Sequence, residues 1–242
     1  MREVQSSLFQ EDPLPQSFYD REVVTVAREL VGCVLVSHTG RHPIAGRIVE
    51  TEAYRQDDPA SHAYGGRRTR NAPMFGPPGH AYVYFIYGMY DCFNIVCGPV
   101  DRGEAVLVRA LEPLSGLETI WRNRYGETKP LPAELSAASL ASSFLRRSIR
   151  PDEQSNGSGP GKGPPAQVRN LTSGPGKLCR ALGITRERVN GTSLTEGPVT
   201  VHRGGRQAEV VATRRIGISK AIEHEWRFLE AGNPFISRPA AK

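Results

Sequence analysis

The sequence predicts one mixed α/β (α+β) domain, in which helices surround a curved, mainly antiparallel sheet and a β-hairpin protrudes from it. Residues 46–109 contain several short stretches where apolar or aromatic residues alternate with polar ones, a pattern typical of strands. Gly88 lies between two of these stretches, which favours a hairpin turn. Residues 21–31 carry a single apolar stripe at helical spacing, which predicts a helix packed on the sheet.

The first half of the chain is expected to hold most of the strands. Residues 1–16 are polar and contain two prolines, so we expect a flexible N-terminal tail before a single domain over residues 17–238. The elements predicted next are a helix at Arg21–Val31 capped by Asp20 and strands at Cys33–Ser37, Arg47–Tyr54, His80–Tyr87, Tyr90–Val96 and Gly103–Leu111, the last ending at Pro113.

The second half of the chain alternates helical and loop patterns. Residues 151–168 are rich in Gly, Pro and Ser, which predicts a mobile loop inserted within the domain. Ser173–Lys177 begins a helix that runs through Leu182, and its glycines lack the spacing of a nucleotide-binding loop, which excludes an ATPase. The other elements expected here are helices at Gly116–Tyr125 and Pro130–Arg150 and strands at Pro198–His202 and Glu209–Arg214, joined by an RGGR turn.

The composition fits a protein that folds without disulfides, metals or cofactors. A chain of 242 residues can bury a sizeable core, and its net charge of +6 is compatible with a nucleic-acid partner. No two of the four cysteines form a CxxC pair, so we expect reduced thiols and no zinc site. The first residues lack the basic start and apolar core of a signal peptide, and no apolar run is long enough to span a membrane.

Glu50 and Glu52 are two residues apart on a predicted strand, so both carboxylates and Tyr54 are expected on one face of the sheet. Two carboxylates that close repel each other, and one has a raised pKa if the site is dry. That arrangement suits acid–base chemistry on a glycosidic or acyl bond. A half-solvated strand with two surface glutamates gives the same spacing.

The predicted hairpin carries aromatic side chains where turns usually carry small polar ones. Tyr82 and Tyr84 share a face and could form a wall for a flat ring, or a buried pair with satisfied hydroxyls. At the tip, Tyr87 is costly to expose unless it inserts into a partner. A stack of DNA bases and a protein groove are both candidates.

Basic residues accompany glycines in two segments. Arg67 and Arg68 lie in a Gly-rich loop that follows His62, and their guanidinium groups suit a phosphate backbone, although a solvated loop has the same composition. Lys177 lies at a Gly-rich helix start, which is a candidate phosphate site.

Several motifs in fixed order make the chain, from Phe18 to about Ser237, similar to one known family. These motifs are IVETEAY, SHAYGG, YVYFIYGMY, FNI, VLVRALEP, GLET, SGPGKLCRAL and RIGIS. Together they resemble the alkyladenine (3-methyladenine) DNA glycosylases, monofunctional purine-DNA glycosylases of base-excision repair. Several motifs in order are far more specific than any one of them alone.

The resemblance implies a role for each matching residue. It makes Glu52 the general base that activates water and Arg109 a residue that helps hold that water. It implies that Tyr87 is the wedge that enters the duplex, and that Ile216–Ile218 lies near the sugar. It implies a base-binding set of Tyr54, His62, Tyr84 and Asn94, in which Asn94 disfavours normal guanine. Glu50 matches without a catalytic role, so we expect it to be structural.

The resemblance also implies the reaction and the partner. The enzyme would flip alkylated or deaminated purines (3-methyladenine, 7-methylguanine, hypoxanthine, ethenoadenine) out of duplex DNA, hydrolyse the N-glycosidic bond and leave an abasic site. No lysine occupies a nucleophile position, so no lyase step is expected. We expect a monomer that is cytoplasmic or nucleoid-associated in a bacterium and nuclear in a eukaryote. The alternatives are a non-catalytic nucleic-acid-binding domain on the same scaffold and an enzyme or binder that acts on RNA.

Overall fold

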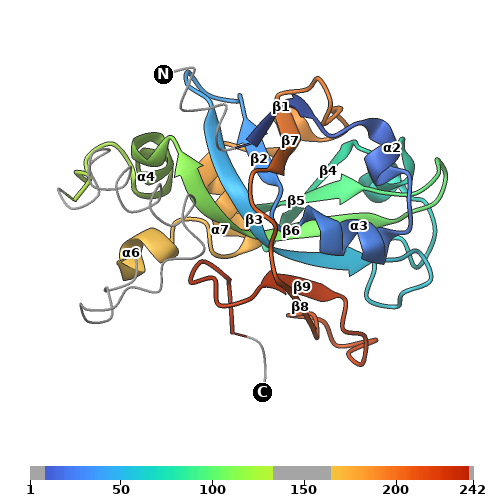
Figure 1. Ribbon diagram of the computed structural model, residues 1–242. Coiled ribbons are helices and arrows are strands. Elements are labelled where there is room, and N and C mark those ends of the chain that lie inside the picture. The colour runs from blue at the N-terminus through green and yellow to red at the C-terminus, as the bar shows by residue number, and fades with distance from the viewer. Residues whose placement is uncertain (1–8, 133–164, 240–242) are drawn as a thin grey trace.

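The computed structural model describes residues 9–132 and 165–239 and is organised around one nine-stranded sheet (Figure 1). All pairings between the described strands are antiparallel, in the order β1-β7-β2-β3-β6-β5-β4, and β9 joins β3 to β8. The strands are β1 Phe9–Pro13, β2 Val34–Ser37, β3 Ile44–Tyr54, β4 Ala81–Ile86, β5 Tyr90–Val96, β6 Ala105–Ser115, β7 Val199–Gly204, β8 Val210–Thr213 and β9 Arg227–Glu230. The predicted class, a single mixed α/β domain with a curved antiparallel sheet, is confirmed.

Strand β3 is the centre of the sheet and pairs with β2, β6 and β9. Every residue from Ile44 to Ala53 is buried, because β3 lies between neighbouring strands and α3 packs on it. The polar residues of the IVETEAY motif therefore lie inside the protein, where each one requires a partner.

Helices pack on both faces of the sheet. The helices are α2 Gln16–Tyr19, α3 Val23–Leu30, α4 Leu117–Tyr125, α6 Ala166–Arg169, α7 Pro175–Leu182 and α8 Arg186–Val189, with a 3-10 helix at Thr69–Phe75. Helix α3 crosses the face of the sheet that is turned to the viewer in Figure 1, and its buried stripe packs on β3 and β6. Helix α7 packs on β5 and β6, and α4 packs on α7.

The predicted hairpin is formed by β4 and β5, whose register pairs Ile86 with Tyr90. Tyr87 and Gly88 have φ angles of 54° and 66°, and the Met89 amide donates to the Ile86 carbonyl at 3.2 Å. Two consecutive positive φ angles with this hydrogen bond are the features of a type I′ turn, which matches the twist of the strands. The glycine therefore lies where the turn needs it, while Tyr87 adopts a conformation that tyrosine rarely takes.

Three predicted boundaries were wrong. Phe9–Pro13 lies within the predicted flexible tail but forms β1, because it finds a free edge on β7. Helix α3 begins two residues later than expected, since Glu22 rather than Asp20 caps it by accepting from the Thr25 amide at 2.7 Å. Strand β6 continues past Pro113, which is tolerated because the β3–β6 register is irregular there.

The second half of the chain differs from its prediction in connectivity. The predicted strands at Pro198–His202 and Glu209–Arg214 form β7 and β8, but β7 pairs with β1 and β2 while β8 pairs with β9. Of the predicted loop at 151–168, residues 166–168 form the first turn of α6, and residues 151–164 lie outside the described residues. The predicted helix at Pro130–Arg150 also lies outside them beyond position 132.

The four cysteines, Cys33, Cys92, Cys97 and Cys179, are buried free thiols. No helix within residues 9–132 and 165–239 is long and apolar enough to cross a membrane.

Candidate active site

Glu50 and Glu52 are both fully buried, so the alternative of two surface glutamates is wrong. They lie on β3 opposite Ala110 and Leu107 of β6, and β9 closes the other edge of β3. Ionised carboxylates in such a position are stable only with charged or hydrogen-bonding partners.

Glu52 has three partners that come from three separate segments. Tyr54 donates its hydroxyl to Oε2 at 2.9 Å, and Arg109 donates Nη1 to the same oxygen at 3.1 Å. The backbone amide of Ile216 donates to Oε1 at 2.7 Å. Among the described residues Oε1 accepts only this one bond, so its second lone pair remains available to a water molecule or a ligand.

Burial raises the pKa of Glu52, and the charge of Arg109 and the bonds from Ile216 and Tyr54 oppose that rise. Burial disfavours the charge of Arg109 as well, but Glu52 and Glu50 outweigh it and raise the pKa of that guanidinium. Arg109 therefore stays charged beside Glu52. A buried carboxylate with a raised pKa is a stronger proton acceptor than an ordinary surface glutamate.

Both carboxylate oxygens of Glu50 accept hydrogen bonds from described residues, and Glu50 does not line the cavity described below. Its Oε1 accepts from Arg109 Nε at 3.0 Å, Arg227 Nε at 2.7 Å and Ser237 Oγ at 2.8 Å. Its Oε2 accepts from the Ser237 amide at 2.5 Å. The arrangement fits the structural role expected for Glu50, since it fixes Arg109, which in turn contacts Glu52.

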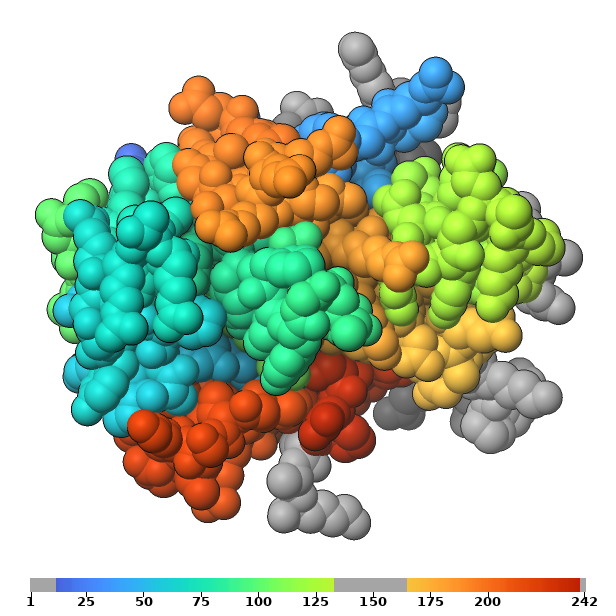
Figure 2. Space-filling view, turned by 180° about the vertical axis from the view of Figure 1, so that it is seen from behind, coloured from blue at the N-terminus to red at the C-terminus, as the bar shows by residue number. Residues whose placement is uncertain are grey.

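A cavity of about 560 Å³ opens next to this cluster. Most of the predicted site residues line it: Tyr54, His62, Tyr84, Tyr87, Asn94, Arg109 and Lys177. Glu52 is fully buried and lies directly behind Tyr54, Arg109 and Ile216, all of which line the cavity. The hairpin forms one side of the cavity, and in Figure 2 it stands near the middle of the face shown.

Aromatic side chains gather at one end of the cavity. His62 lies with its ring centroid 4.5 Å from that of Tyr84 and donates to or accepts from the Tyr82 hydroxyl through Nδ1 at 3.0 Å. Tyr82 is buried and its hydroxyl is hydrogen-bonded, which matches the alternative of a buried tyrosine with a satisfied hydroxyl. Tyr84 is only partly buried and lines the cavity, which matches the alternative of a wall for a flat ring.

Burial, and then the charge of Arg70, lower the pKa of His62. The imidazole is therefore neutral at pH 7 and offers one donor and one acceptor nitrogen rather than a positive charge. A neutral ring beside Tyr82 and Tyr84 can contact a base edge, and it is not a ready source of protons.

Asn94 lies on β5 at the cavity and is itself buried. Its Nδ2 donates to the backbone oxygens of Tyr82 at 3.0 Å and Cys92 at 3.2 Å. These two bonds hold the amide in one orientation. A fixed amide is what the expected role of Asn94 requires, which is to exclude guanine through its exocyclic amino group.

The hairpin tip lies at the mouth of the cavity. Tyr87 is 81% exposed and, like Ile86 and Tyr90, lines the mouth. A large aromatic side chain held out on a tight turn is unusual for a structural role.

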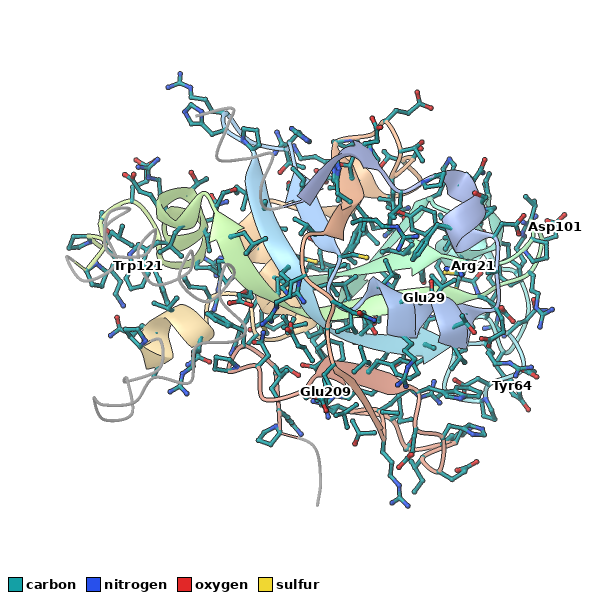
Figure 3. The ribbon with its side chains drawn as sticks, viewed as in Figure 1. Arg21, Glu29, Tyr64, Asp101, Trp121 and Glu209 are labelled. Carbon is teal, nitrogen blue, oxygen red and sulfur yellow. The ribbon has the colours of Figure 1, made fainter. Side chains whose placement is uncertain are left out.

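The three predicted backbone-binding cations are not brought together. Arg67 donates to the Phe75 carbonyl and pairs with Asp101 at 2.8 Å, and neither it nor Arg68 lines the cavity. Lys177 does line it. Arg67 pairs with Asp101, and Lys177 is on α7, which packs on α4. Figure 3 places Asp101 at one end of the molecule and Trp121, part of α4, at the other, so the two cations lie far apart.

Some residues of the site gave no signal in the sequence. Arg227 contacts Glu50 only because β9 pairs with β3, more than 170 positions away in the chain. Arg215 begins the RIGIS motif but was given no role; it is buried behind Tyr54, with its guanidinium carbon 4.7 Å from the ring centroid, and it pairs with Asp58. The RIGIS motif pointed to residues 216–218, but not to the Ile216 amide as a ligand of Glu52.

In the part of the chain that the structure describes, no group of three or more His, Cys, Asp or Glu residues is placed to hold a metal ion.

Comparisons with known proteins agree on one family. A family model described as methylpurine-DNA glycosylase matches residues 17–234. A protein of Methanoculleus marisnigri is 43% identical over 230 residues, covering 93% of this chain and 98% of its own length. Proteins of Carboxydothermus hydrogenoformans and Bacillus cereus are 40% and 41% identical at the same two coverages. All three carry the name "Putative 3-methyladenine DNA glycosylase".

Proposed function

The chain belongs to the methylpurine-DNA glycosylase family, and from that premise we propose that it removes alkylated or deaminated purines from duplex DNA by hydrolysis. The observation that carries this proposal is Glu52, a buried carboxylate with a raised pKa that lies against an aromatic cavity. It lies behind Tyr54, Arg109 and Ile216, which line the cavity, and its Oε1 accepts only the Ile216 amide bond among the described residues, so one lone pair is free for water.

The chemistry follows from these groups. A water molecule bound to Glu52 attacks C1′ of the deoxyribose while Glu52 accepts its proton. The N-glycosidic bond breaks, and its electron pair leaves with the purine. Arg109 fixes the carboxylate, and the negative charge of Glu52 stabilises the oxocarbenium character of the sugar. A cationic alkylated purine leaves as a neutral base and Glu52 returns its proton to solvent, whereas a neutral purine such as hypoxanthine leaves as an anion and takes up a proton from solvent. An abasic site and a free base are the products.

The aromatic end of the cavity suits the proposed substrates. Tyr54, Tyr84 and His62 offer ring faces and edges to a flat base, and stacking contributes about 1–3 kcal/mol per base without demanding one hydrogen-bond pattern. N-alkylation gives a purine positive charge, which electron-rich tyrosine faces attract. The fixed amide of Asn94 would disfavour the exocyclic amino group of normal guanine.

A base in a duplex must leave the stack before it reaches this cavity, at a cost of a few kcal/mol. Tyr87 is exposed at the mouth and would enter the duplex in place of the flipped base.

Replacing Tyr87 with Ala should weaken capture of the flipped state, measured by the fluorescence of 2-aminopurine next to the lesion. The matched control is Tyr64→Ala, an exposed tyrosine outside the cavity lining.

The direct test uses a labelled duplex with a single hypoxanthine or 1,N6-ethenoadenine. Wild type should release the base, so that strand breaks appear only after hot alkali. Glu52→Gln should lower base release by about 100-fold or more while lesion binding persists, because the side chain keeps its size and loses its basicity. Glu104→Gln is the control, since Glu104 is also buried with a raised pKa but lies outside the cavity lining.

Other outcomes would point elsewhere. Breaks without alkali would mean a lyase step and an amine nucleophile. Equal base release by wild type and Glu52→Gln would remove Glu52 as the base. Binding without base release by either protein would favour a non-catalytic nucleic-acid-binding domain, and preference for a ribose substrate would favour an enzyme acting on RNA.

A further inference from the structure

Three cations line the cavity on the side formed by helices α4 and α7, close to Tyr90 of the hairpin. Lys177 and Arg180 come from α7, and Arg124 comes from the last turn of α4, which packs on α7. Arg124 and Lys177 are half-buried, and Arg180 is exposed. The proposed reaction uses none of these three side chains.

None of the three forms an ion pair with another described residue. Arg124 Nε donates to the Leu171 carbonyl at 3.0 Å, and Arg180 Nε donates to the Asn123 carbonyl at 3.1 Å. Lys177 Nζ donates to Asn170 Oδ1 at 3.3 Å. All of these acceptors are neutral, and most of the donor groups of the three side chains remain available.

The three cations are close enough to affect one another. Burial, with a contribution from Arg180, lowers the pKa of Arg124, and burial and then Arg124 lower the pKa of Lys177. Like charges held together without a counter-charge destabilise one another. A bound anion would relieve that repulsion, and arginine forks match phosphate oxygens well.

The cavity is also larger than a base alone requires. Its 560 Å³ falls within the range for drug-sized ligands, and the three cations line it together with Tyr54, His62 and Tyr84. An occupant with a flat ring at one end and an anionic group at the other would contact both sets of residues. A nucleotide within a DNA strand has this combination.

We propose that Arg124, Lys177 and Arg180 form a phosphodiester-binding site for the damaged DNA strand, next to the nucleotide whose base enters the aromatic end. This inference depends on the proposed function, because it takes DNA as the partner. In Figure 2 the hairpin separates α4 from residues 55–80, so this site flanks the hairpin on one side. Contacts there would position the strand so that the Tyr87 hairpin tip meets the lesion.

The first experiment measures binding to a duplex with a tetrahydrofuran abasic analogue, at several salt concentrations. The double variant Lys177→Gln/Arg180→Gln should bind about 10-fold or more weakly, and its slope of log Kd against log salt should fall by about 1 for each phosphate that the variant no longer neutralises. Arg122→Gln is the matched control, because Arg122 is also on α4 but pairs with Glu118 and does not line the cavity. Its slope should equal that of wild type.

The second experiment replaces single phosphates around the lesion with uncharged methylphosphonates. One or two positions should weaken wild-type binding, and the double variant should bind these modified duplexes as well as the unmodified one, because its side chains no longer bind those phosphates. Arg122→Gln should be weakened as much as wild type. Competition by inorganic phosphate or a free mononucleotide, without any methylphosphonate effect, would mean a small-molecule phosphate site and would overturn the proposal.

The outcomes separate this proposal from the glycosylase proposal. If wild type releases the base but the double variant behaves like Arg122→Gln in both experiments, the proposed phosphodiester site is wrong and the glycosylase proposal is kept. If the methylphosphonate effect is present but wild type releases no base, the site stands and the glycosylase proposal fails. Should the double variant fail to fold, the exposed single variant Arg180→Gln takes its place in both experiments.

Discussion

At the scale of single residues, the two glutamates of β3 differ through their surroundings rather than their chemistry. Both bind Arg109, but Glu50 also binds Arg227 and Ser237, which occupy both of its oxygens. Glu52 instead contacts residues that line the cavity. The same residue type therefore has a structural role at Glu50 and is a candidate general base at Glu52.

Glu50 should tune the basicity of Glu52. Burial is the main cause that raises the pKa of Glu52, Arg109 opposes it, and the nearby charge of Glu50 adds to the rise. Glu50→Gln removes that charge, so the pKa of Glu52 should fall. The acid limb of the pH profile of kcat/KM should then move to lower pH, because Glu52 ionises earlier. The rate at pH 7 should fall several-fold, since the base is weaker.

The control for this profile is Glu112→Gln. Glu112 is another largely buried carboxylate whose pKa burial raises, but its hydrogen-bond partner is Asn233 and it does not line the cavity. Its substitution should leave the acid limb in place. If the acid limb of the kcat/KM profile does not move in Glu50→Gln either, Glu50 acts only by holding Arg109.

At the scale of elements, the hairpin is supported by helix α7. Gly176, in the first turn of α7, packs so closely on Tyr90 that an added Cβ would lie 2.9 Å from three atoms of that side chain. Tyr90 begins β5 and pairs with Ile86 across the hairpin. The position of the tip at Tyr87 therefore depends on a glycine nearly ninety residues away.

Gly176→Ala should lower lesion excision by roughly 10- to 100-fold, because a misplacement of about 1 Å away from the chemistry can cost that much. Helix propensity alone would favour alanine by about 1 kcal/mol, so any loss is steric. Single-turnover base release measures the effect. In the control, Gly40→Ala, the nearest atom to the new Cβ is 4.0 Å away, and the rate should not change. Unchanged excision by Gly176→Ala would contradict the supporting role of α7.

At the scale of the whole molecule, the site is held together by a buried ion network that spans the chain. Glu50 on β3 joins Arg109 on β6, Arg227 on β9 and Ser237 near the described C-terminal end. Arg227 also donates to the backbone oxygen of Arg238. The C-terminal segment therefore closes over the same carboxylate that positions Arg109, which couples stability to the candidate site.

Arg227→Met should lower the free energy of unfolding by about 3–5 kcal/mol, because it leaves part of a buried carboxylate's charge without a partner. Urea denaturation at pH 7 measures this loss. The double variant Glu50→Gln/Arg227→Met should lose less than the two single variants added together, since it removes the charge along with its partner.

Arg21→Met is the control for that measurement. Its ion pair with Glu29 is largely exposed, and the change should cost less than about 1 kcal/mol. A loss of similar size in Arg21→Met and Arg227→Met would show that burial of the network contributes little.

Local patterns in the sequence were enough for the class of fold, the hairpin and most strands. The IVETEAY alternation, the glycine in YGMY and the apolar stripe of α3 act over a few residues, so they are visible without a structure. The motifs also pointed to Glu52, Tyr54, His62, Tyr84, Asn94 and Arg109, which lie at or directly behind one cavity. Their roles in catalysis stay predictions.

Only the tertiary structure decided which distant groups complete the site. Arg227, the Ile216 amide and Ser237 reach the β3 carboxylates because β9 pairs with β3 and the chain returns to it, and no local pattern encodes that pairing. Burial had the same origin: Arg109, Arg227, the Ile216 amide and Ser237 surround the two glutamates, which could have been solvated, and make them a desolvated pair. Desolvation and long-range pairing are properties of the packed molecule, and they separate an ordinary carboxylate from a candidate base.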